Sequence, residues 1–233
     1  LQRSPAIQLG AIQGLSGLSD PQVSGAIIAA WDGLSPSVRR EAIEVLLSRS
    51  QWSHDLLDAI ERQQISASYI ETARRSSLLN HADEELRTQA QALLGSERQT
   101  PRNEVVNTYL PALSLSGDAQ RGQVVYQKNC MSCHRLGNQG FEVGPNLATI
   151  QGRTPDALLA QILDPNRDVL ANYMQYSVLT DNGRVVTGLI ASESPTSLTL
   201  RRAEAIEETL LRQNIEEISG SGKSIMPEGL EQN

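Results

Sequence analysis

The sequence predicts a mainly α-helical protein with one small antiparallel β-segment near its C-terminal end. Apolar residues follow helical spacing over residues 1–98, and the period changes to two from about residue 174. Both cysteines of the chain fall in one short motif, Cys130-Met131-Ser132-Cys133-His134. A chain of 233 residues is long enough for one large domain or two small ones.

The first 98 residues show only helical patterns. Asp20-Pro21 and Ser35-Pro36 each combine an N-cap residue with a proline suited to the first helical turn. The pattern that starts at Ser4-Pro5 recurs at Ser35-Pro36, and a weaker copy follows near Leu86. Paired helices that recur in this way resemble HEAT repeats, and an irregular helical bundle is the alternative.

A connector over residues 99–116 separates this part from the rest. Thr100-Pro101 and Pro111 interrupt any long helix there. A new helix begins after Gly117-Asp118, and another occupies residues 155–164 with Thr154 as its N-cap. We therefore predict a helical repeat domain over 1–98, a linker over 99–116 and a second domain over 117–233.

The β-segment begins with an alternating stretch over residues 176–180. Asp181-Asn182-Gly183 is a strong hairpin turn, and return strands follow over 184–191, 197–201 and 209–212. We interpret the segment as an insertion at about 174–218 in the second domain. The acidic residues late in it are interpreted as a solvated face: Glu204, Glu207, Glu208, Glu216 and Glu217.

The cysteine motif carries the chemistry. Two thiols on one helical turn, followed at once by an imidazole, suit thioether bonds to the two vinyl groups of haem, with His134 facing the iron. A zinc half-site, a thioredoxin-like redox pair and a chance match are the alternatives. Zinc needs more ligands, whereas His54 and His81 lie in the helical repeats, and a redox pair needs a βαβ setting. We predict one covalent haem c.

Several further motifs carry a family resemblance. Gly122, Tyr126 and the cysteine motif resemble the opening of class I cytochrome c, and Gly144-Pro145-Asn146-Leu147 resembles the segment that follows it. Ile162–Asn166 and Ser224–Leu230 make the planctomycete-type haem-binding domain the nearest family. That domain follows HEAT-like repeats in large secreted dehydrogenase-like proteins. The resemblance covers the chain from about residue 117 and implies a class I cytochrome c domain.

The resemblance also implies roles for residues around the iron. Met226-Pro227 resembles the distal loop, which makes Met226 the second axial ligand, with Met174 as its rival. The carbonyl of Pro145 would accept a hydrogen bond from His134. Arg153 would pair with a haem propionate, although it also fits an ordinary surface cation. Because the β-segment separates Met226 from His134, we expect it to cover a haem edge, bind a partner or mediate dimerisation.

Charge and ligation limit the function. The net charge is −7 and basic residues cluster only in pairs, so nucleic acid is not an expected partner. No apolar run approaches the ~20 residues that span a bilayer. Two filled axial positions favour electron transfer over catalysis, so we expect no enzyme. The expected role is relaying electrons from an oxidoreductase, such as an upstream dehydrogenase domain, to a soluble or respiratory carrier.

Two other functions remain open from the sequence. One is a haem enzyme or sensor with an open sixth site, and the other is a HEAT-based interaction module with a structural haem. By resemblance, haem attachment places the chain in the periplasm or another extracytoplasmic space. Because the chain starts at Leu1 and ends soon after the distal loop, we expect a piece of a longer protein that lacks the family's C-terminal helix. The oligomeric state is left open, with a dimer among the alternatives.

Overall fold

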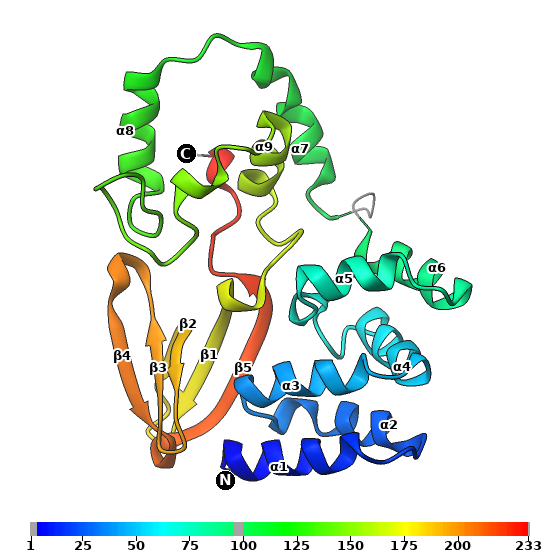
Figure 1. Ribbon diagram of the computed structural model, residues 1–233. Coiled ribbons are helices and arrows are strands. Elements are labelled where there is room, and N and C mark those ends of the chain that lie inside the picture. Colours follow the sequence, from blue (N-terminus) through cyan, green and yellow to red (C-terminus); the bar gives the residue numbers. More distant parts are fainter. Residues whose placement is uncertain (1–3, 96–99, 233) are drawn as a thin grey trace.

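Short helices stacked in two rows form the N-terminal part of the chain (Figure 1). A computed structural model describes residues 4–95 and 100–232, so the predicted boundary at residue 98 lies outside the described residues. Helix α1 packs on α3, α2 packs on α4, and α4 packs on α6. The helices are α1 (Pro5–Ser16), α2 (Gln22–Ala29), α3 (Pro36–Leu46), α4 (Ser50–Glu61), α5 (Thr72–Leu79) and α6 (Glu84–Leu94).

The proline-based helix starts are close to the prediction. Ser35 is the N-cap of α3, as expected. Helix α2 starts one residue later than expected, because Pro21 itself occupies the N-cap position. The Asp20 carboxylate still accepts a hydrogen bond from the backbone N–H of Gln22 at 2.8 Å, which satisfies one free donor of the helix start.

A five-stranded antiparallel sheet follows late in the chain, in the order β4-β3-β2-β1-β5. The Asp181–Gly183 turn joins β1 to β2 as predicted. Strand β5 was not predicted, and Glu216 and Glu217 are exposed residues on it. The β-segment thus extends to residue 224 rather than 218. The strands are β1 (Met174–Thr180), β2 (Val185–Glu193), β3 (Ser197–Arg201), β4 (Glu207–Leu211) and β5 (Ile215–Ser224).

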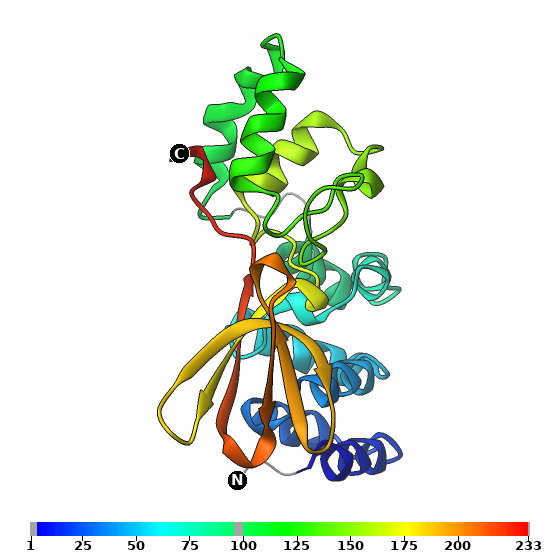
Figure 2. The same ribbon diagram turned by 90° about the vertical axis from the view of Figure 1, so that its left-hand side faces the viewer.

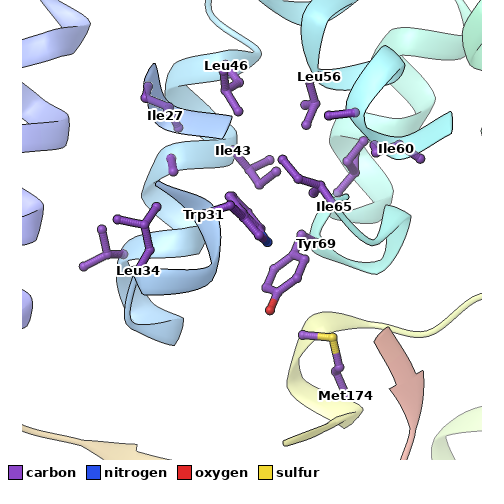
Figure 3. Close-up of a cluster of buried hydrophobic side chains, with 14 of the residues drawn as sticks. Ile27, Trp31, Leu34, Ile43, Leu46, Leu56, Ile60, Ile65, Tyr69 and Met174 are labelled. Atoms are coloured by element: carbon purple, nitrogen blue, oxygen red, sulfur yellow. The ribbon is translucent and has the colours of Figure 1, made fainter. Parts of the chain in front are cut away.

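The sheet and the N-terminal helices share one hydrophobic core. Figure 3 shows Trp31 and Tyr69 from the helical part beside Met174 of β1. The two rings meet edge to face with centroids 5.0 Å apart, and the Ser68 hydroxyl donates to the Met174 sulfur at 3.4 Å. The strands of the β-segment therefore pack against the N-terminal helices.

Arg39 places a positive charge inside this shared core. Its side chain is 3% exposed, and Nη1 donates to the Tyr69 hydroxyl at 3.0 Å. Nε and Nη2 donate to the backbone carbonyls of Trp31 and Asp32. The Tyr69 hydroxyl also contacts that of Tyr176 at 3.3 Å, and burial raises the pKa of Tyr176, so this phenol stays neutral.

The part of the chain that contains the cysteine motif has three helices: α7 (Asn103–Tyr109), α8 (Ala119–Asn129) and α9 (Pro155–Leu163). Asp118 caps α8 and Thr154 precedes α9, as predicted. These helices bury few side chains of their own, since α8 has no buried residue and α7 and α9 bury only Val106 and Leu163. Within residues 4–95 and 100–232, no helix is long and apolar enough to cross a membrane.

Candidate haem site

The cysteine motif forms a turn at the C-terminal end of α8. Backbone N–H groups of Cys130 and Met131 donate to the Tyr126 carbonyl, and that of His134 donates to the Cys130 carbonyl at 2.8 Å. This continued turn keeps both thiols and the imidazole on one short piece of chain. Both cysteines are unpaired and half-buried.

The state of the thiols distinguishes between the alternatives for this motif. Burial, with a smaller contribution from Cys133, raises the pKa of the Cys130 thiol above its ordinary value. A catalytic redox thiol instead needs a lowered pKa, because the thiolate is the nucleophile. Among the residues that the structure describes, no set of three His, Cys, Asp or Glu side chains is placed to hold a metal ion. The raised pKa of Cys130 weighs against the redox pair.

The imidazole of His134 is held from one side. Its Nδ1 lies 2.8 Å from the Pro145 carbonyl oxygen, the contact that the resemblance implied. This hydrogen bond places the proton on Nδ1 and leaves Nε2 as the basic nitrogen. Gly144 lies flat against the ring, since a Cβ added there would come within 2.5 Å of His134 Cε1.

The loop after the motif folds back onto it. Val143 and Gly144 donate backbone N–H groups to the Cys133 carbonyl at 2.9 and 2.7 Å. The Tyr126 hydroxyl donates to the His134 carbonyl at 2.8 Å, so this tyrosine braces the backbone. Gly140 has φ +84° and approaches the His134 carbonyl too closely for any side chain. The ring orientation of His134 is thus fixed by contacts within residues 126–145.

Met226 lies in the segment that follows β5. Its side chain is half-buried, and its backbone N–H donates to the Ser224 hydroxyl at 3.1 Å. The Ile225 N–H donates to the Tyr173 carbonyl at 3.0 Å, which ties the start of this segment to the chain leading into β1.

The other methionines have different surroundings. Met174 is fully buried in the core shared by the sheet and the N-terminal helices, with its sulfur bonded by the Ser68 hydroxyl. Met131 lies between the two cysteines. A sulfur that is buried among apolar side chains elsewhere is poorly placed to bind iron, so Met174 is the weaker candidate.

Arg153 is exposed, and its backbone N–H closes a turn onto Ile150. In the described part of the chain its guanidinium has no side-chain partner. Its predicted pairing with a haem propionate therefore stays a prediction, compatible with an extended cation at the surface.

The tip of the β3–β4 hairpin also touches the motif. The backbone N–H of Glu204 donates to the Ser132 carbonyl at 2.6 Å. Glu204 and Ala205 both have positive φ, at 61° and 55°, which is uncommon for residues other than glycine. Figures 1 and 2 agree in placing this tip beside the loop of the motif.

The residues around the motif fit a covalent haem. Two free thiols and a basic imidazole nitrogen supply its attachment and one axial bond. Gly144 gives the imidazole room that a Cβ would fill. Nearby segments also leave large apolar side chains substantially exposed, which a porphyrin would cover; these are Leu136, Phe141, Ile162 and Leu170.

Comparisons with known proteins agree with this chemistry. The family described as Cytochrome c matches residues 119–179, which run from α8 into β1. A Synechocystis protein named "Cytochrome c-553-like" is 31% identical over 75 residues, covering 28% of this chain and 70% of that protein. The chain belongs to the cytochrome c family. A protein named "Cytochrome c" from Stellaria longipes is 33% identical over 69 residues, covering 25% of this chain and 64% of its own length.

As a member of that family, this cytochrome c binds haem c covalently with iron. The sequence predicts Cys130 and Cys133 as attachment residues, but it does not predict three contacts around them. The hairpin tip at Ser132 and the side chain of Asn166 near Met226 join segments that are distant in sequence. The third contact, the close approach of Gly144 to the imidazole, lies within one loop. Only Gly144 had a local signal, as part of the Gly-Pro-Asn-Leu motif.

Proposed function

We propose that this cytochrome c is an electron-transfer module whose single haem is attached through Cys130 and Cys133 and ligated by His134 and Met226. The bond between His134 Nδ1 and the Pro145 carbonyl carries the proposal, because it orients Nε2 as a ligand. When bound, haem c supplies a one-electron iron couple. A thioether opposite the imidazole favours ferrous iron and raises the reduction potential.

Met226 is the distal ligand in this proposal. It is half-buried, it precedes a proline that stiffens the segment, and both flanks of this segment are hydrogen-bonded to the rest of the domain. Met174, its rival, is enclosed in another core. With both axial positions taken by the chain, a substrate has no place on the iron, so the proposed role is not enzymatic. Arg153 would face a haem propionate.

The remaining parts of the chain serve as a scaffold in this proposal. The alternate stacking of α1 on α3 and of α2 on α4 supports HEAT-like repeats, with the cytochrome domain from about residue 117 onward. Electrons would come from an oxidoreductase, such as a dehydrogenase domain of the same parent protein, and go to a soluble or respiratory carrier. As for other c-type cytochromes, the compartment would be periplasmic or otherwise extracytoplasmic.

The ligand assignment is tested on the full chain with its haem, by comparing Met226→Ala with Met174→Leu. We expect Met226→Ala to lose the sulfur-to-iron charge-transfer band at the red end of the ferric spectrum and to have a lower midpoint potential. Met174→Leu keeps the buried volume and should retain both properties.

Other spectra would contradict the proposal. Loss of the band in Met174→Leu alone would make Met174 the ligand. A high-spin ferric spectrum in the unmodified protein would indicate an open sixth site and favour a haem enzyme or sensor. A midpoint potential outside the range of respiratory carriers, with no electron exchange, would favour an interaction module with a structural haem.

A further inference from the structure

The turn that ends α9 holds the Met226 segment at two points. The Asn166 side-chain oxygen accepts a hydrogen bond from the Ser224 backbone N–H at 2.8 Å. Its side-chain nitrogen donates to a carboxylate oxygen of Glu228 at 2.6 Å. Ser224 lies two residues before Met226 and Glu228 lies two residues after it. The side-chain amide of Asn166 therefore binds the chain on both sides of Met226, the proposed ligand.

We propose that Asn166 is a positioning residue for Met226: it holds the methionine segment closed so that the thioether stays on the iron. The inference rests on the proposed ligation by Met226. An amide suits this task because it offers an acceptor and a donor at one short side chain. Aspartate at this position would retain the acceptor for Ser224 but would place a carboxylate against Glu228.

Several hydrogen bonds fix the turn that carries Asn166, whose two hydrogen bonds to Ser224 and Glu228 are called the clamp below. Asp164 is 3% exposed, and its carboxylate accepts from the Thr100 hydroxyl at 2.5 Å and from Arg167 Nε at 3.3 Å. Arg102 donates to the Leu163 carbonyl from the same side. The residues before Asn166 are thus bonded to the connector ahead of α7, which fixes the turn from which the amide projects.

The segment between the two clamped residues has little regular structure to hold it. Residues 225–227 contain no helix or strand. The Met226 N–H donates to the Ser224 hydroxyl and not to a backbone carbonyl of a neighbouring strand. Pro227 restricts the backbone before it, and Gly229 has φ +85°. A segment fixed at both ends loses less conformational freedom when its methionine binds iron, so the clamp preorganises the ligand.

Competition by imidazole tests the proposal, because free imidazole binds the iron only when Met226 dissociates. The variants are Asn166→Ala, Asn166→Asp, and Asn166→Asp combined with Glu228→Gln, all on the haem-loaded full chain. Each lost hydrogen bond should raise the apparent imidazole affinity about two- to tenfold. The double variant places a new amide opposite the new carboxylate, and should return the affinity towards that of the unmodified protein.

Ser221→Ala is the matched control. It removes the hydrogen bond from the Ser221 hydroxyl to the Gln175 carbonyl, together with the contacts of that hydroxyl with the Lys223 backbone. These contacts fasten the end of β5 but do not bridge Met226. This variant should leave imidazole affinity and midpoint potential unchanged. An equal rise in affinity for Ser221→Ala and Asn166→Ala would overturn the positioning role, since any loosening near β5 would then suffice.

The result also separates this inference from the ligation that it assumes. If the unmodified protein shows the sulfur-to-iron band, Met226→Ala loses it, and Asn166→Ala matches the unmodified protein in imidazole affinity and potential, only the clamp is refuted. If Met226→Ala retains the band, the ligand assignment fails first.

Discussion

Gly144 lies against the imidazole of His134, and the orientation of that ring depends on it. A Cβ at this position would lie 2.5 Å from Cε1 and 2.9 Å from Nδ1 of His134, well inside van der Waals contact. The ring would have to turn, which would weaken its bond to the Pro145 carbonyl.

Gly144→Ala should therefore alter the ferric electron paramagnetic resonance spectrum and lower the free energy of unfolding by roughly 1–3 kcal/mol. Gly152→Ala is the control, because a Cβ there meets no atom within 4 Å. Thermal unfolding and spectra of the two variants check the prediction. If neither variant changes the spectrum or the unfolding temperature, the loop adapts to the added methyl group without moving the imidazole.

Local chemistry explains which site residues the sequence revealed. Cys130, Cys133 and His134 act together because they are neighbours in the chain, so their spacing alone predicts the haem. Asn166 has no such signal, because an amide after Asp-Pro is an ordinary turn residue. The residues of the five-stranded sheet separate Asn166 from its partners Ser224 and Glu228 in the sequence. Only folding brings the three residues together.

An ion pair between Arg102 and Glu231 holds the chain that follows Met226. Arg102 Nη2 lies 2.5 Å from the Glu231 carboxylate, while its Nε holds the end of α9. The hydrogen bond from Arg102 is the main cause of a lowered pKa for Glu231, and it raises the pKa of Arg102 in turn. Asp164 and Glu228 also act on Arg102.

The direction of this shift sets a pH dependence. A carboxyl whose pKa is lower in the folded than in the unfolded state stabilises the folded protein at pH values above its unfolded-state pKa, about 4.3. This stabilisation is lost as the pH falls through the folded-state pKa. The sulfur-to-iron band should therefore fade as the pH falls below about 4. Glu231→Gln should show a smaller loss over this range, and an identical acid profile would assign the effect to other carboxyls.

Strand β5 shows why the element pattern was only partly predictable. Its N-terminal half buries Ile215 and Ile218, a spacing of three that does not resemble a strand. Pairing with β1 makes this stretch a strand, because the register shifts between Leu179 and Thr180, opposite Glu217 and Ile215. A second shift lies between Met174 and Tyr176, opposite Ser224 and Gly220. Gly220 is needed there, because a Cβ would come within 2.8 Å of the Tyr69 hydroxyl. The helix starts at Asp118 and Thr154 were predicted correctly, because a capping carboxylate in the first case and a first-turn proline in the second are local signals.

At the scale of the whole molecule, the shared core limits how the chain can be divided. The sheet buries Met174, Tyr176 and their neighbours against helices before residue 95. A fragment of residues 117–233 would expose this apolar face, although the sequence pattern alone predicted a domain with those bounds. We expect such a fragment, loaded with haem, to unfold at a markedly lower temperature than the full chain or to self-associate. A monomeric fragment with the same unfolding temperature would show an independent domain.

The contact between the β3–β4 tip and Ser132 has a geometric consequence for electron exchange. The tip touches the Ser132 carbonyl between Cys130 and Cys133, and the strands behind it are packed on the N-terminal helices. An ion pair between Arg75 of α5 and Asp168, which follows α9, is a second link between the N-terminal helices and the part of the chain that contains the motif. A haem attached beside this contact would keep one orientation relative to the N-terminal helices. A protein that grips these helices would meet the iron from a single direction, and the distance an electron travels would be set by the fold.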